Sequence, residues 1–176
     1  MAPISMVFLI TGFAVFVQSF FFLGIGAKGD EGKKSPIVPV GVAALVAGIV
    51  DLAIAFYMTV GRPIGDDPSL HLSGLVGIYG LFFVVLGLAE IYDLDLKIVG
   101  NLAIPTAIVP LAWLNFFAGS ATFTVILLWW VVAFASIALT TYGKMQAKVL
   151  GIVLLITAVL TFMAVPVANV LEITLP

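Results

Sequence analysis

The sequence predicts an all-α integral membrane protein with six transmembrane helices arranged as three helical hairpins. Hydrophobic residues make up 63% of the 176 residues and charged residues only 9%, and the mean hydropathy is +1.30. These values lie far outside the range of soluble domains. The apolar residues also form long blocks, separated by short clusters that hold nearly all the charges, which is the arrangement that membrane spans require.

Each of the six apolar blocks is about 20 residues long or slightly longer, enough to cross a hydrocarbon core of about 30 Å. Ser35-Pro36 opens the second block as a helix start. We expect Pro105 and Pro110 to kink the fourth span. The chain is predicted to be one membrane domain, residues 1–176, whose first block is retained as a span. The expected spans are approximately residues 4–27, 36–60, 70–92, 98–117, 121–142 and 148–172.

The basic residues predict the orientation of the spans, because Lys and Arg near span ends are retained on the cytoplasmic side. The side reached by the second and fourth loops carries only Arg62. We therefore expect both termini outside and three hairpins of the same sense, a layout that would suit a threefold internal repeat, although the hairpins share only weak sequence similarity. The first, third and fifth loops carry Lys28, Lys33, Lys34, Lys97, Lys144 and Lys148.

The composition excludes several functions. The chain has no cysteine and a single histidine, so it can form neither a disulfide framework, a thiolate nucleophile nor a cysteine metal site. It has no HExxH-like metal pair and no glycine-rich phosphate loop. The net charge of −2 includes no basic stripe, which argues against nucleic acid as a partner. We predict that the protein is not an enzyme and needs no metal or other cofactor.

Three ionisable residues are candidates for gating or coupling. Asp51 lies well inside the second span, where an ionisable group must face the protein interior or water. It is either a pore-lining or gating carboxylate or a structural acid bonded to a neighbouring helix. Glu90 lies near the end of the third span, from which its side chain can reach the interface. His71, on the predicted outer side, is either a sensor of external acidity or an ordinary interfacial histidine.

Aromatic residues share one face of the fifth span. Phe123, Leu127, Trp130 and Phe134 recur at helical spacing. A narrow pore walled by such side chains would pass small neutral planar solutes and reject hydrated ions, whose dehydration it cannot compensate. The alternative is an aromatic stripe that faces lipid or the core.

Uncharged amide side chains lie within or near the spans and offer hydrogen bonds. They would either bind an amide-like solute or brace neighbouring helices. The residues are Gln18, Asn101, Asn115 and Asn169.

Three segments carry a resemblance to a known family. They are residues 12–19 (GFAVFVQS), residues 80–87 (GLFFVVLG) with Leu94-Asp95 after them, and residues 114–116 (LNF) with residues 123–130 after them. Together they resemble the UreI/AmiS family of bacterial urea channels and short-chain amide transporters. The resemblance extends over nearly the whole chain.

The resemblance assigns roles to individual residues. Gln18 stands where the family has asparagine, Phe83 falls at an aromatic pore position and Trp130 matches a signature tryptophan. Leu127 and Phe134 occupy places where the family often has tryptophan. With Phe123 and Asn115, these residues are the expected pore lining.

The resemblance also implies a mode of action. It implies a homohexamer in a bacterial or archaeal cytoplasmic membrane, with a central pore in each protomer that passively conducts urea or short-chain aliphatic amides. A functional link to a cytoplasmic urease or amidase follows from the same likeness. Because the outer loop has His71 alone, we expect weak proton gating or none.

Two other functions remain open from the sequence. One is a proton-coupled carrier for a small monocarboxylate such as acetate, in which Asp51 would be the coupling group. The other is a membrane scaffold that conducts nothing.

Overall fold

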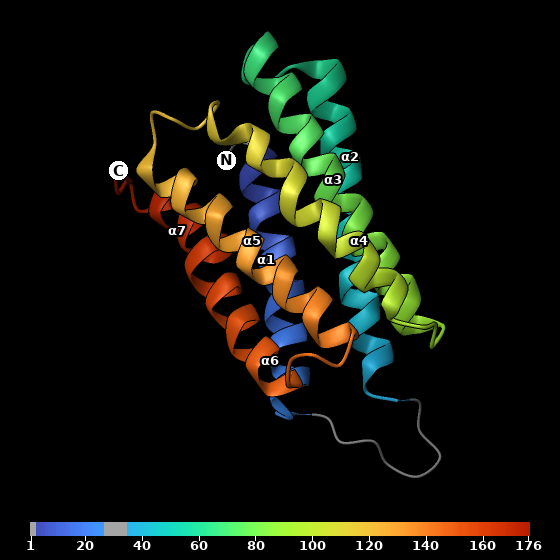
Figure 1. The fold of residues 1–176 in the computed structure, drawn as a ribbon. Coiled ribbons are helices and arrows are strands. Elements are labelled where there is room, and N and C mark those ends of the chain that lie inside the picture. The colour runs from blue at the N-terminus through green and yellow to red at the C-terminus, as the bar shows by residue number, and fades with distance from the viewer. Residues whose placement is uncertain (1–2, 27–34) are drawn as a thin grey trace.

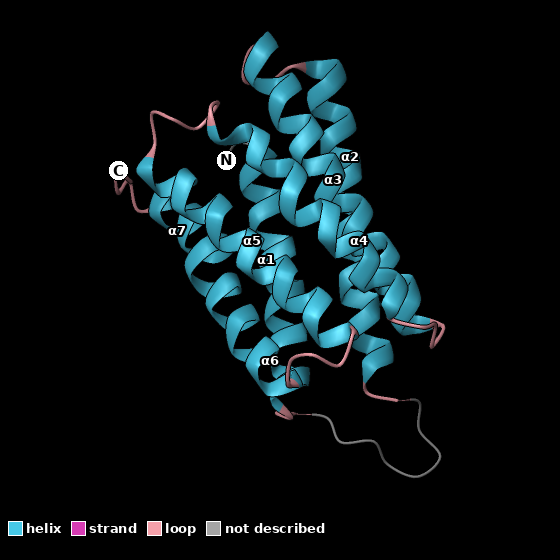
Figure 2. Ribbon diagram, viewed as in Figure 1, coloured by secondary structure: helices cyan, strands magenta, loops and turns pink. Residues whose placement is uncertain are grey.

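The computed structural model describes residues 3–26 and 35–176, which include six helices long and apolar enough to cross a membrane (Figure 1). The regular secondary structure of these residues is entirely helical (Figure 2), so the predicted all-α fold with six spans is confirmed. The fourth span ends as a 3₁₀-helix, η1, and a π-helix, η2, divides the sixth. The bounds are α1 Pro3–Leu23, α2 Ile37–Gly61, α3 Asp66–Ile91, α4 Lys97–Ile108, η1 Val109–Leu114, α5 Ala121–Thr141, α6 Ala147–Ile156, η2 Thr157–Met163 and α7 Ala164–Val170.

The helices form a closed ring in chain order. Each span packs mainly against the spans that precede and follow it, and α1 closes the ring by packing along α6, η2 and α7. The contact is not equally extensive around the ring. The pairs α2–α3, α4–α5 and α6–α1 are in more extensive contact than the α3–α4 and α5–α6 pairs. The ring therefore encloses a central axis, and Figure 1 shows the helices from the side, running along the length of the bundle.

The helix ends differ from the expected spans by a few residues, each for a local reason. α1 ends at Leu23, where Gly24 has a φ of 73° and terminates the helix; Ala27 and the lysines at 28, 33 and 34 lie outside the described residues. α3 begins at Asp66, before the expected Leu70. Asp66 suits a helix N-terminus, and its carboxylate also lies 3.0 Å from the Arg62 guanidinium.

The prolines change the helical geometry of two spans. α4 continues through Pro105, but at Pro110 the chain adopts the tighter 3₁₀ form. In the sixth span, Pro166 has no N–H to bond the carbonyl of Phe162, and the wider π-helix lies in the turns before it. The prolines thus disturb the fourth span by changing the helix type at its end. The π-helix of the sixth span is an irregularity that was not expected.

Four glycines bring α2 and α3 into close contact. Gly41 and Gly48 of α2 face Gly87 and Gly80 of α3, so that the backbones nearly touch. A Cβ added at Gly48 would lie 2.5 Å from the backbone nitrogen of Val84, and one at Gly87 would lie 2.5 Å from that of Leu45. Neither backbone can yield, so small residues are needed at these positions.

We predict that Gly87→Ala weakens the fold, because the added methyl group would collide with the α2 backbone. The expected loss is about 1–3 kcal/mol, measured as a lower midpoint of thermal unfolding in detergent. Gly77→Ala is the matched control on the same helix, since its Cβ would meet only the Ala55 side chain at 3.9 Å. Equal midpoints for the two variants would show that the close α2–α3 approach does not limit stability.

Candidate functional site

Two cavities lie in line along the axis of the ring. The first, here called the Glu90 cavity, has a volume of about 230 Å³ and is bounded by residues 15–22 of α1, 82–90 of α3 and 130–141 of α5, with side chains of α4, α6 and η2. The second, the Asp51 cavity, has a volume of about 140 Å³ and is bounded by residues 4–11, 72–79 and 123–130 of the same three helices. The two cavities thus follow one another along α1, α3 and α5, and each can hold several molecules of the size of water.

Aromatic rings separate the two cavities. Trp130 and Phe162 line both of them, and their rings stack with centroids 4.7 Å apart. The Tyr79 ring meets the Trp130 indole edge-on at 4.8 Å and stacks on Phe134 at 5.4 Å. Phe8 approaches the Trp130 ring from α1 at 5.9 Å. These five rings, here called the aromatic partition, close the axis near its middle.

Hydrogen bonds to the π-helix hold the tryptophans of α5. The Trp130 indole N–H donates to the hydroxyl of Thr161 at 2.8 Å, and the Trp129 N–H donates to that of Thr157 at 2.9 Å. Each threonine hydroxyl in turn donates to a carbonyl of its own helix. Both threonines lie in η2, so the irregular segment of the sixth span sets the position of the partition. Such π-turns occur frequently at functional sites.

Asp51 is sealed between α2 and α1. Its side chain is 0% exposed, and the hydroxyl of Thr11 lies 2.8 Å and 3.0 Å from its two oxygens. Its Cβ packs over Gly80 of α3. The carboxyl therefore links α2 to α1 and also forms part of the wall of the Asp51 cavity.

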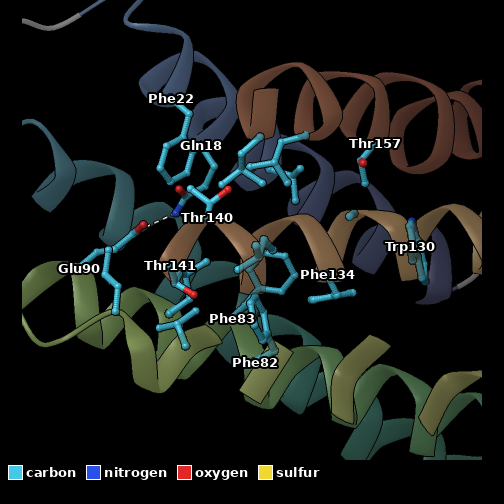
Figure 3. Close-up of a pocket in the computed structure, with 18 of the residues that line it drawn as sticks. Gln18, Phe22, Phe82, Phe83, Glu90, Trp130, Phe134, Thr140, Thr141 and Thr157 are labelled. Carbon is cyan, nitrogen blue, oxygen red and sulfur yellow. Dashed lines mark hydrogen bonds between the residues drawn. The ribbon is translucent and has the colours of Figure 1, made fainter. Parts of the chain in front are cut away.

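Glu90 forms the corresponding contact in the other cavity (Figure 3). Its carboxyl is 2% exposed, and the amide nitrogen of Gln18 donates to Oε2 at 2.7 Å. Gln18 and Glu90 both line the Glu90 cavity. Glu90 therefore turns into the ring. It does not reach the membrane interface, which its place near the end of α3 would allow.

Two hydroxyls are buried without a partner. Among the side-chain polar atoms of the described residues, the Tyr79 and Thr140 hydroxyls are inaccessible and make no hydrogen bond. Tyr79 lines the Asp51 cavity next to the partition, and Thr140 lines the Glu90 cavity. Because buried hydroxyls rarely lack a partner, each offers a binding capacity to whatever enters the cavities.

The structure brings most of the expected pore residues to the axis. Gln18, Phe83 and Phe134 line the Glu90 cavity, Phe123 and Leu127 line the Asp51 cavity, and Trp130 lines both. The four residues of the α5 face thus point into the ring and not into lipid.

Two expected residues lie away from both cavities. Asn115 is exposed at the end of the fourth span and belongs to neither cavity wall. His71 is exposed on the first turns of α3, where its ring stacks on Phe116 at 5.1 Å and its Nδ1 lies 2.9 Å from the carbonyl oxygen of Asp67.

Sequence reasoning missed several residues that form the site. Thr11, Tyr79, Thr140 and Phe162 carry no charge or amide group and so were not singled out. One signal was present: Gly41, Gly48 and Asp51 in α2 have the same spacing as Gly80, Gly87 and Glu90 in α3. A search for this repeat would have paired the two acids.

Comparison with solved structures identifies the fold. No family model matches the sequence, and no curated protein is significantly similar to it. A cryo-EM structure described as the Helicobacter pylori urea channel in the closed state matches with a TM-score of 0.80 and 13% sequence identity, covering 96% of this chain and 98% of that one. This chain has the urea-channel fold. The architecture implied by the UreI/AmiS resemblance is thereby confirmed over nearly the whole chain, and the channel function is considered below.

We predict that Thr11→Val destabilises the protein, because it leaves the Asp51 carboxyl without a hydrogen-bond donor in the described structure. The expected loss is about 1–3 kcal/mol, or more if the carboxyl is charged, seen as a lower thermal midpoint in detergent. Thr106→Val is the control, since the buried Thr106 hydroxyl bonds only the Leu102 carbonyl of its own helix. A Thr11→Val midpoint equal to that of the control would contradict a tie between α1 and α2.

Proposed function

We propose that this protein is a passive membrane channel for urea or short-chain aliphatic amides. The observation that carries the proposal is the pair of cavities in line on the ring axis, separated by a single aromatic partition. The resemblance of residues 12–19, 80–87, 114–116 and 123–130 to the UreI/AmiS family and the fold shared with a urea channel support it.

The chemistry of the walls accounts for selection by charge. The cavity walls are mostly aromatic and aliphatic, and the two carboxyls in them already accept hydrogen bonds from Thr11 and Gln18. An ion that entered would lose its hydration shell and gain little in return. A small neutral amide loses fewer water contacts, and its planar faces can lie against the rings of Trp130 and Phe134. The walls therefore favour neutral planar solutes.

The partition also accounts for selection by size. With Trp130 stacked on Phe162, the two cavities are separate, so passage requires these rings to move apart. Side chains in packed interiors do change rotamer. A solute larger than the opening would be excluded at this point.

The surroundings of the channel complete the proposal. His71, Asp66 and Asp67 lie at the end of the ring that carries the start of α3, while Lys97, Lys144 and Lys148 lie at the opposite end. This distribution supports both termini outside in a bacterial or archaeal cytoplasmic membrane. The family resemblance suggests a homohexamer with one pore in each protomer, delivering solute to a cytoplasmic urease or amidase.

Stopped-flow permeability of proteoliposomes tests the function. We expect urea and acetamide to enter vesicles containing the protein faster than protein-free vesicles of the same lipid. His71 is exposed and remote from both cavities, so His71→Ala should leave flux at neutral pH intact. Urea and acetamide flux equal to that of protein-free vesicles would contradict the channel proposal.

We predict that Trp130→Ala changes selectivity. Removing the indole opens the partition between the cavities, so the permeability for acetamide and larger amides should rise relative to that for urea. The measurement is the ratio of amide to urea permeability in the same vesicles. Trp129→Ala is the control, because Trp129 neighbours Trp130 and also bonds the π-helix but lines neither cavity. Ratios that match the wild type in both variants would place the selective barrier elsewhere.

The buried acids favour one second candidate, a proton-coupled carrier of a small monocarboxylate. Asp51 and Glu90 lie in the walls of successive cavities, and a carboxyl group can carry a proton across. The discriminating measurement is accumulation of acetate against its gradient, driven by a pH difference and abolished by Asp51→Asn. A passive pore cannot accumulate any solute.

A further inference from the structure

The α2–α3 pair places two acids in equivalent positions. The spacing of Gly41, Gly48 and Asp51 repeats as Gly80, Gly87 and Glu90, and the two helices pack antiparallel through these glycines. As a result Asp51 packs over Gly80 and Glu90 packs over Gly41. Each acid accepts a hydrogen bond from α1, one from Thr11 and the other from Gln18. The two sites can therefore be compared as internal counterparts.

The counterparts differ in what they leave free. The Thr11 hydroxyl lies within hydrogen-bond distance of both oxygens of Asp51, and the side chain is wholly inaccessible. Gln18 bonds only the Oε2 atom of Glu90, and no described residue donates a hydrogen bond to Oε1. The larger cavity beside Glu90 also contains the partnerless hydroxyl of Thr140. The Tyr79 hydroxyl also lacks a partner, but it lies in the Asp51 cavity next to the aromatic partition. The Glu90 cavity therefore differs in having both a carboxyl oxygen and a hydroxyl left to bond.

The polar groups of the Glu90 site come from three helices around one end of the cavity. Gln18 lies on α1, Glu90 on α3 and Thr140 on α5, and all three line the Glu90 cavity. Figure 3 shows them at the end of the cavity away from Trp130. Thr140 follows Trp130 by ten residues on α5, which is about 15 Å along a helix. The cluster therefore lies well apart from the aromatic partition.

We propose that Gln18, Glu90 and Thr140 form a recognition site for the carboxamide group of the solute. Glu90 accepts a hydrogen bond from a solute N–H, the Thr140 hydroxyl donates to the solute carbonyl, and Gln18 holds the Glu90 carboxyl in place. This inference rests on the proposed function and assigns it a chemical basis for selecting amides. The Asp51 site, in contrast, ties α1 to α2.

The donor and acceptor pattern of the site fits urea and primary amides. These molecules present a carbonyl acceptor and N–H donors in one plane, which matches a hydroxyl on one wall and a carboxyl on another. A diol of similar size, such as ethylene glycol, also donates and accepts hydrogen bonds, but its hydroxyls are not held in one plane and its oxygens are weaker acceptors than an amide carbonyl. The hydrogen bonds of the site replace water that an amide sheds on entering, so they lower the barrier for amides more than for diols.

Thr140→Val tests the site, because it removes the hydroxyl and keeps the shape of the side chain. The readout is the ratio of urea to ethylene glycol permeability in proteoliposomes. We expect this ratio to fall by about three- to tenfold, the worth of one hydrogen bond, and Thr140→Ser to keep it near the wild-type value. Ser136→Ala is the matched control, since Ser136 lies one turn away on α5, bonds the Val132 carbonyl and lines neither cavity.

The outcomes separate this inference from the function on which it rests. A wild-type protein that passes urea, with an unchanged ratio in Thr140→Val, overturns the recognition site and leaves the channel intact. An equal fall in Thr140→Val and Ser136→Ala also overturns it, because the effect would then be a general disturbance of α5. If the wild-type protein passes no urea at all, the proposed function itself fails. Should Thr140→Val not assemble, Glu90→Gln is measured in its place, with the same expected fall in the ratio.

Discussion

The need to pair polar groups inside a membrane is the constraint on which this structure depends. In hydrocarbon an unpaired polar group has no water to bond, so its partner must come from the protein. Here α1 provides those partners: Thr11 donates a hydrogen bond to Asp51, and Gln18 donates one to Glu90. The donors are seven residues apart, so they lie on one face of α1, and this face is turned toward the close α2–α3 pair. The same contacts attach the first helix to α2 and α3.

The closed ring determines where cavities can form. Because each span packs mainly against its two chain neighbours, the space along the axis is filled by side chains alone. Those side chains leave two cavities and one aromatic partition between them. The partition is held by Thr161 of the π-helix, whose hydroxyl accepts from the Trp130 indole. A local departure from α-helical geometry in the sixth span thus positions the Trp130 indole that separates the two cavities.

The sequence predicts the number and type of elements well, for a physical reason. Long apolar blocks can cross a bilayer only as helices or closed barrels, and their length and lack of strand-like alternation select helices. The common face of Phe123, Leu127, Trp130 and Phe134 is also readable, because helical periodicity fixes which residues of one helix lie together. The structure adds that this face turns toward the axis.

Helix rotation and pairing are much harder to read. Lipid and protein core are both apolar, so the hydrophobic pattern does not say which side of a span faces inward. Asn115 illustrates the difficulty, since an amide expected in the pore is exposed at the end of the fourth span. The pairing of Asp51 with Thr11 and of Glu90 with Gln18 depends on contacts between distant parts of the chain, as does the isolation of the Thr140 hydroxyl. Only the repeated glycine and acid spacing in α2 and α3 hinted at it.

The central claim is that solute passes along the axis of each ring, and the absence of cysteine from the chain permits a direct test. Ala133 is buried in the wall of the Glu90 cavity, whereas its neighbour Val132 is 45% exposed on the outside of the ring. The measurement is urea flux into proteoliposomes carrying Ala133→Cys or Val132→Cys, before and after treatment with a small water-soluble thiol reagent. The account predicts that the reagent blocks urea flux in Ala133→Cys and leaves it unchanged in Val132→Cys. Urea flux that persists in treated Ala133→Cys, whether the thiol has reacted or has stayed out of reach, would contradict a route through the ring.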